Sequence, residues 1–141
     1  MKKTSLALAL FTVLSANTCK KGNNTAVTVA DIAGKQWTLQ SLAGKDIAMP
    51  EGKQAPWIKG DAESGRLEGF GGCNQLMGSF KMDGSNISFP GLGGTKMMCP
   101  DVQEVENGFK TALSQATSYK LDGSTLKLLN GGTELAALVA K

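Results

Sequence analysis

The stretch FGGCNQLMGSF, residues 70–80, places a cysteine and an asparagine behind two glycines, between two segments of alternating polarity. Gly71 and Gly72 allow the backbone to adopt positive φ or to approach another strand closely. Asn74 can hydrogen-bond its own backbone in an Asx-type turn. We therefore interpret this stretch as a structural corner between two strands rather than as a catalytic loop.

Alternating apolar and polar residues on both sides of this corner predict about eight short strands. Tight turns are indicated at 83–84, 122–123 and 130–132, where Asp or Asn precedes Gly. A total of 18 glycines also favours many turns over long helices. The predicted strands lie within 37–42, 47–49, 55–61, 66–70, 75–82, 86–90, 117–121, 124–129 and 133–140.

One helix is predicted, from about Pro100 to Ala116. Its apolar residues recur every three or four positions, and Glu104, Glu106 and Lys110 fall outside this apolar repeat. A helix late in a chain of short strands implies a mainly β (α+β) fold. We expect a small antiparallel β-barrel-like sheet of about eight short strands, packed around one α-helix. The helix is expected to enter the core through Val105, Phe109 and Leu113.

The N-terminal residues resemble an export signal. Lys2 and Lys3 precede an apolar run from Leu6 to Leu14, which is too short to span a bilayer. We therefore predict a signal peptide at 1–18, a flexible tether at 19–34 and a single domain at 35–141. We therefore expect an exported protein of the cell envelope, located at the outer membrane.

Cys19 directly follows this segment, a position typical of lipoprotein processing. Cleavage before Cys19 and acylation of its sulfur and new amino group would attach the protein to a membrane. Ala16 and Thr18 depart from the usual residues before such a cysteine, so a soluble periplasmic or secreted protein is the alternative. Acylation of Cys19 would leave Cys73 and Cys99 as an even pair, which we expect to form a disulfide. A reactive thiolate at Cys99, before the predicted helix, is the alternative.

Composition excludes several classes of function. Of 15 basic residues, loss of Lys2 and Lys3 leaves 13 against 12 acidic ones, and this balance does not favour nucleic-acid binding. The chain has no histidine, which removes the usual catalytic triads and the commonest zinc sites. The carboxylates form no pattern suited to acid–base catalysis. We expect no metal and no cofactor, and we expect Met77, Met82, Met97 and Met98 to fill gaps in the core rather than to bind soft metal or line a ligand cavity.

Taken together, the corner, the segment TKMMC at 95–99 and the helix that carries Glu106 and Phe109 resemble the META domain family, a group that includes heat-shock lipoproteins. The resemblance covers most of residues 36–139. Its motif residues, interpreted as structural, are Trp37, the corner Gly72-Cys73-Asn74, Gly78, Phe80, Thr95, Met97 and Cys99. The chain departs from the usual pattern at Gly71 and Lys96.

This resemblance implies a small β-barrel-like domain with one helix, similar to lipid-binding pilot proteins that escort outer-membrane secretion rings. Members resemble envelope or secreted proteins linked to stress, antibiotic tolerance or virulence, and no catalytic activity defines them. We therefore expect a monomeric, non-enzymatic binding or assembly module, with an envelope protein as its partner. The alternative is a carrier of a lipid or another apolar ligand inside the barrel.

If Cys19 carries the lipid anchor, the change Cys19→Ala should release the protein from the membrane fraction into the soluble periplasmic or extracellular fraction. Fractionation followed by mass spectrometry of the N-terminus measures both the location and the modification. A wild-type protein that is already soluble and begins at another residue would contradict the prediction.

Overall fold

The computed structural model describes residues 26–141. The predicted signal peptide, Cys19 and the tether up to residue 25 lie outside the described residues. Eleven strands within 26–141 form one antiparallel sheet. Their bounds are β1 Gln36–Leu42, β2 Lys45–Asp46, β3 Trp57–Gly60, β4 Arg66–Phe70, β5 Gln75–Ser79, β6 Lys81–Asp83, β7 Asn86–Ser88, β8 Gly93–Gly94, β9 Ser118–Asp122, β10 Thr125–Asn130 and β11 Thr133–Ala140.

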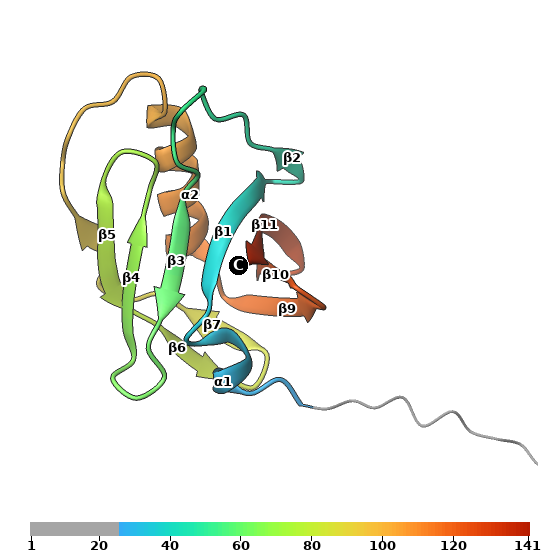
Figure 1. Cartoon of the computed structure of the whole chain (residues 1–141). Helices are drawn as coiled ribbons and strands as arrows, with labels where there is room; N and C mark the ends of the chain where they lie inside the picture. Colours follow the sequence, from blue (N-terminus) through green and yellow to red (C-terminus); the bar gives the residue numbers. More distant parts are fainter. Residues whose placement is uncertain (1–25) are drawn as a thin grey trace, which may run out of the picture.

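The sheet is curled but not closed (Figure 1). Its order is β6-β7-β9-β10-β11-β1-β3-β4-β5-β8, with β2 paired to β1, so β6 and β8 are the two ends. The chain passes from one end region to the other at Phe80, which separates β5 from β6. β5 pairs with β4, whereas β6 pairs with β7. Residues 75–83 therefore contribute a strand to each side of the curled sheet, which we call the half-barrel.

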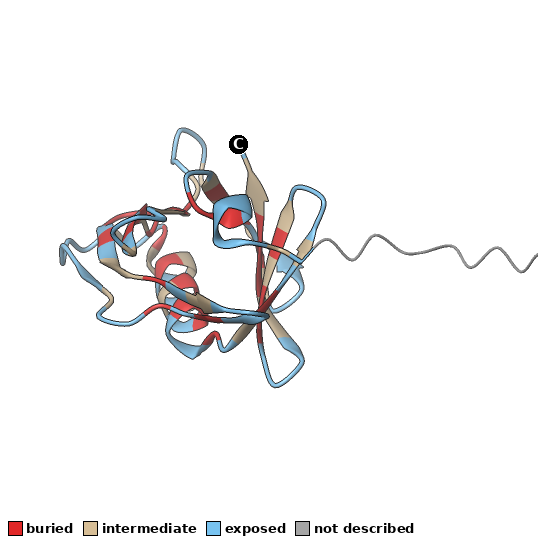
Figure 2. Ribbon diagram, turned by 90° about the horizontal axis from the view of Figure 1, so that it is seen from below, coloured by how far each residue is buried: buried red, intermediate tan, exposed pale blue. Residues whose placement is uncertain are grey.

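Helix α2, Gln103–Gln115, packs against β1, β7, β10 and β11. Figure 2 shows its buried residues turned toward the sheet. Phe109 and Leu113 are completely buried, and Val105 is half-buried against the same core. These contacts confirm the predicted apolar face of the helix. The three-stranded C-terminal meander is also confirmed, with Asp122 opposite Thr125 and Asn130 opposite Thr133 across its two turns.

The fold class is confirmed, but several details differ from the predictions. More strands are present because the two-residue strands β2 and β8 were not predicted and because Phe80 divides the expected strand at 75–82. The strand expected at 47–49 is absent, since the pairing with β1 ends at Asp46. The helix begins at Gln103 rather than Pro100, since the N–H of Val102 donates to the carbonyl of Cys99 (3.1 Å) and closes a turn first. Glu106, expected outside the apolar face, has no exposed surface.

A short helix, α1 (Val29–Ile32), precedes the first strand. Ile32 is buried, and the indole Nε1 of Trp37 donates a hydrogen bond to its carbonyl oxygen (2.7 Å). The last residues of the expected tether are therefore packed on the sheet. The contact with Ile32 explains why Trp37 of the motif is buried. Trp37 holds α1 against β1, the first strand.

Truncation of Phe109 to Ala should lower the free energy of unfolding by about 3 to 5 kcal/mol, because a fully buried aromatic ring leaves a cavity. Urea unfolding monitored by circular dichroism measures the change. Ser114→Ala, at an exposed position of the same helix, is the matched control and should change stability little. A loss below about 1 kcal/mol for Phe109→Ala would contradict the packing described here.

Candidate functional site

The corner between β4 and β5 is a four-residue turn, Gly71 to Asn74. The N–H of Gly71 donates to the carbonyl of Asn74 (2.8 Å), and Phe70 pairs with Gln75 across the strands. Cys73 and Asn74 are buried although they occupy a turn. Their backbone N–H groups point away from the sheet ladder and need another acceptor.

The carboxylate of Glu106, from the first turn of α2, is that acceptor. Its Oε2 accepts the backbone N–H groups of Cys73 (3.0 Å) and Asn74 (2.7 Å). Its Oε1 accepts the side-chain amide of Asn74 (2.7 Å) and the ammonium group of Lys110 (2.7 Å). A carboxylate has about four lone-pair positions, so these four donors satisfy it fully.

Asn74 also connects this carboxylate to the segment before the helix. Its amide nitrogen donates to the carbonyl of Met97 (3.0 Å), and its Oδ1 accepts the backbone N–H of Met97 (2.6 Å). The hydroxyl of Thr95 donates to the same Oδ1 (2.9 Å) and accepts the N–H of Gln75 (3.1 Å). The side chain of Asn74 thus pairs with Met97 much as a neighbouring strand would.

The glycines of the motif permit close approach. A Cβ on Gly71 would lie 2.7 Å from Oε2 of Glu106, so only glycine lets the carboxylate reach the turn. Gly72 has φ +113°, a conformation that L-residues rarely adopt. A Cβ on Gly78 would lie 3.2 Å from the carbonyl oxygens of both Pro90 and Gly91. The three positions therefore explain why glycine occurs around the corner.

A disulfide joins Cys73 to Cys99, with their Cα atoms 5.9 Å apart, which confirms the predicted pairing. The bond links the corner to Cys99, the residue that begins the turn before α2. For a sequence separation of 26, the chain-entropy model gives about 3 to 4 kcal/mol of stabilisation. Because both sulfurs are bonded, Cys99 is not a free thiolate in this structure.

The surroundings of Glu106 favour the charged form of its carboxylate at neutral pH. Burial by itself raises the pKa of Glu106. The hydrogen bonds from Lys110, from the side chain of Asn74 and from the two backbone N–H groups outweigh burial and lower the pKa from 4.5 to about 2. With its lone pairs occupied and no surface exposed, this group is suited to holding structure rather than to proton transfer.

We refer to Asn74, Glu106, Lys110, Thr95 and the backbone of Met97 as the Asn74 cluster. The structure brings the motif residues Gly72, Asn74, Thr95 and Met97 together here, with Gly78 further along β5, whereas Trp37 lies at α1. Sequence reasoning named Glu106 only as a residue of the resembling helix and missed the buried role that it and Lys110 share. Their i, i+4 spacing was the available signal, because a Glu followed by Lys at that distance forms an ion pair on a helix.

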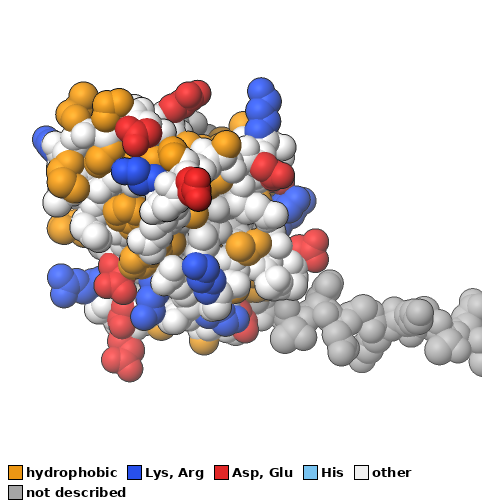
Figure 3. Space-filling view, turned by 45° about the horizontal axis from the view of Figure 1, so that its top comes forward, with side chains coloured by type: hydrophobic (Ala, Val, Ile, Leu, Met, Phe, Trp, Pro, Cys, Tyr) orange, Lys and Arg blue, Asp and Glu red, His pale blue; other side chains and the backbone are white. Residues whose placement is uncertain are grey.

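The prediction that the methionines fill the core is wrong for three of the four. Met77 and Met97 are each 57% exposed and Met98 is 83% exposed, while Met82 packs against the core. Met77 alternates outward from β5, and the hydrogen bonds of the Met97 backbone leave its side chain outside. Figure 3 shows hydrophobic side chains gathered on one side of the visible face.

Within residues 26–141, neither helix has the length and apolar character needed to cross a membrane. The same residues contain no group of three or more Cys, Asp or Glu side chains arranged to hold a metal ion.

Residues 30–141 match the model of the META domain. The chain is 27% identical over 130 residues to "Heat shock protein HslJ" of Escherichia coli (strain K12), which covers 91% of this chain and 89% of that protein. A solved structure of a protein from Burkholderia xenovorans is similar with a TM-score of 0.62, 23% identity and coverage of 100% and 97% of the two chains. A DUF4847 family protein from Bacteroides vulgatus ATCC 8482 has a TM-score of 0.55 at 19% identity, covering 79% and 94%. At these identities the two structures show a shared fold.

Because the pKa of Glu106 is lowered by folding, its charged form stabilises the protein above pH 4.5, and this contribution should disappear as the pH falls from about 4.5 to 2. The contribution is about 3 kcal/mol. Glu106→Gln should remove it at neutral pH, because either orientation of the amide turns its NH₂ toward two donors. Urea unfolding at a series of pH values measures this loss.

Glu104→Gln is the matched control, since Glu104 is exposed on the same helix. It should retain the stability and acid dependence of the wild type. If Glu106→Gln and wild-type protein lose stability in parallel between pH 4.5 and 2, the assigned charge state of Glu106 is wrong.

Proposed function

The chain belongs to the META domain family, and from this membership we propose that it is a non-enzymatic binding or assembly module of the cell envelope. The name of its relative, heat shock protein HslJ, supports a link to stress conditions. Its partner in this proposal is another envelope protein.

One observation carries the proposal: the Asn74 cluster and the disulfide fix a segment that presents apolar side chains to solvent. Residues 95–99 are held by the side chain of Asn74 at Met97 and by the covalent bond at Cys99. Met97 and Met98 nevertheless remain exposed. Exposed apolar side chains on a rigid segment are typical of interaction surfaces, and methionine adapts its shape to a partner.

The polar residues of the motif support a binding role rather than catalysis. Asn74 uses both donors and both acceptor positions of its amide within the protein. Glu106 is fully buried, and its carboxylate has four internal donors. These side chains are occupied with holding the corner, so they have no free group to offer a substrate.

We further propose that the protein is an exported lipoprotein, anchored through Cys19 and most simply located at the outer membrane. The disulfide supports export, because such bonds persist in oxidising compartments. The signal segment at 1–18 is the second support. A soluble periplasmic or secreted form is the alternative, and the test of Cys19→Ala given above separates the two.

A ligand in the interior of the half-barrel is less well supported. The cavity among Ile32, Trp37, Phe80 and their neighbours measures only about 10 Å³, room for one water molecule at most and far below the roughly 300 to 1,000 Å³ of ligand pockets. Side chains fill this space, so a lipid carrier would need to open its core. We therefore place the proposed function on the surface formed by the neighbouring residues Met97 and Met98, the methionine surface.

The test is a photo-crosslinking amino acid incorporated at Met98, in cells that produce the full chain, with Asn130 as the matched exposed control position. We expect a discrete crosslinked partner from position 98, identified by mass spectrometry, and none of the same mass from position 130. The change Met97→Ser should reduce the crosslink without altering the unfolding temperature, since Met97 is exposed. Equal products from both positions, or none from position 98, would contradict the proposal.

A further inference from the structure

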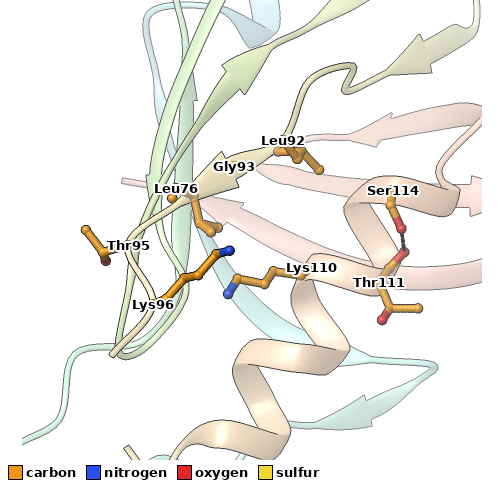
Figure 4. A pocket seen from close by; sticks show the side chains of 9 residues that line it. Leu76, Leu92, Gly93, Thr95, Lys96, Lys110, Thr111 and Ser114 are labelled. Carbon is orange, nitrogen blue, oxygen red and sulfur yellow. Dashed lines mark hydrogen bonds between the residues drawn. The ribbon is translucent and has the colours of Figure 1, made fainter. Parts of the chain in front are cut away.

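A separate pocket of about 370 Å³ lies between the end strand β8 and helix α2. Figure 4 shows Lys96 and Lys110 extending toward one another across it, with Leu76 and Leu92 on the strand side. Leu76 is buried and Leu92 is half-buried, which gives the pocket an apolar floor. Thr111 and Ser114 line it from the helix.

The charge of this pocket is positive. No Asp or Glu lines it, while two lysines do. Lys110 bonds Glu106 at 2.7 Å on its inner side but keeps 38% of its side-chain surface exposed. Lys96 is exposed, and among residues 26–141 it is not part of any ion pair. Two ammonium groups that face one another repel, and an anion between them would relieve that repulsion.

The volume and lining limit the kind of ligand. Pockets of about 300 to 1,000 Å³ hold small molecules, and an apolar wall with a few polar groups fixes their orientation. Here the ammonium groups lie at one part of the rim and the leucines form the floor. A ligand that satisfies both parts needs an anionic group at the end of an apolar chain.

We propose that this pocket binds a single-chain amphiphile, with its anionic head group between Lys96 and Lys110 and its hydrocarbon chain on Leu76 and Leu92. The head group is a carboxylate or a phosphate, both of which suit two ammonium donors. The site differs from the filled interior of the half-barrel and from the methionine surface. It therefore does not depend on the protein partner proposed above.

The test uses decanoate, decyl phosphate and decanol, each below its micelle concentration, titrated into the full chain at low salt. Two-dimensional ¹⁵N–¹H NMR locates the binding site. We expect saturable shifts from decanoate or decyl phosphate at residues 92–96 and 110–114, and weaker binding of decanol. The comparison of the two anions identifies the head group.

Lys96→Ala should weaken binding of the anionic probe by about threefold to fivefold, the effect of one exposed ion pair. Lys120→Ala, at an exposed position on β9, is the matched control and should leave the affinity unchanged. Thr111→Trp, at an exposed position of α2, should obstruct the pocket and abolish the shifts.

The proposal would be overturned by no saturable binding of either anion, by equal binding of decanol and the anions, or by equal effects of Lys96→Ala and Lys120→Ala. Shifts confined to core residues such as Leu126 would also overturn it, because they would place the ligand inside the sheet. Since these readouts do not involve a protein partner, they are independent of the crosslinking experiment.

Discussion

The buried carboxylate of Glu106 is the interaction on which the rest of the corner depends. It is the acceptor for two backbone N–H groups that the turn at Cys73 and Asn74 cannot satisfy within the sheet. Burial of an unpaired carboxylate costs several kcal/mol, so the four donors are a condition for its presence in the interior. Gly71 completes the arrangement, because a larger residue would fill the space that the carboxylate occupies.

Around this carboxylate, three parts of the chain that are distant in sequence become one unit. The helix supplies Glu106 and Lys110, the β4–β5 corner supplies Asn74, and the segment after β8 supplies Thr95 and Met97. The disulfide adds a covalent connection between the corner and Cys99. An open sheet whose end strand β8 contains only two residues needs such connections, because its ladder contributes few hydrogen bonds there.

The same unit accounts for both proposed surfaces. Residues 93–98 extend from β8 toward the helix, and the Asn74 cluster fixes their backbone at Met97. From this fixed segment, Met97 and Met98 are exposed to solvent, whereas Lys96 extends over the pocket toward Lys110. Lys110 belongs to the cluster and to the pocket rim. A protein surface and a small-molecule site can therefore share one rigid support without sharing contact residues.

By itself the sequence determined the elements that depend on near neighbours. Alternation along β1 and β4, the turns at Asp122-Gly123 and Asn130-Gly131, and the repeat of Phe109 and Leu113 are local patterns, and each predicted element is present. The count of three cysteines, with Cys19 assigned to the lipid anchor, similarly pointed to the pair Cys73 and Cys99.

Only the tertiary structure decided the environment of Glu106, the exposure of Met97 and Met98, and the division of the strand at Phe80. The periodic pattern assigns a glutamate to solvent and a methionine to the core, because it uses only the hydrophobicity of each side chain and not the partners that the side chain meets in the fold. The buried position of Glu106 becomes favourable only when donors from residues 73, 74 and 110 converge on it within 3.0 Å. That convergence depends on contacts between residues more than 30 positions apart, which no local pattern contains.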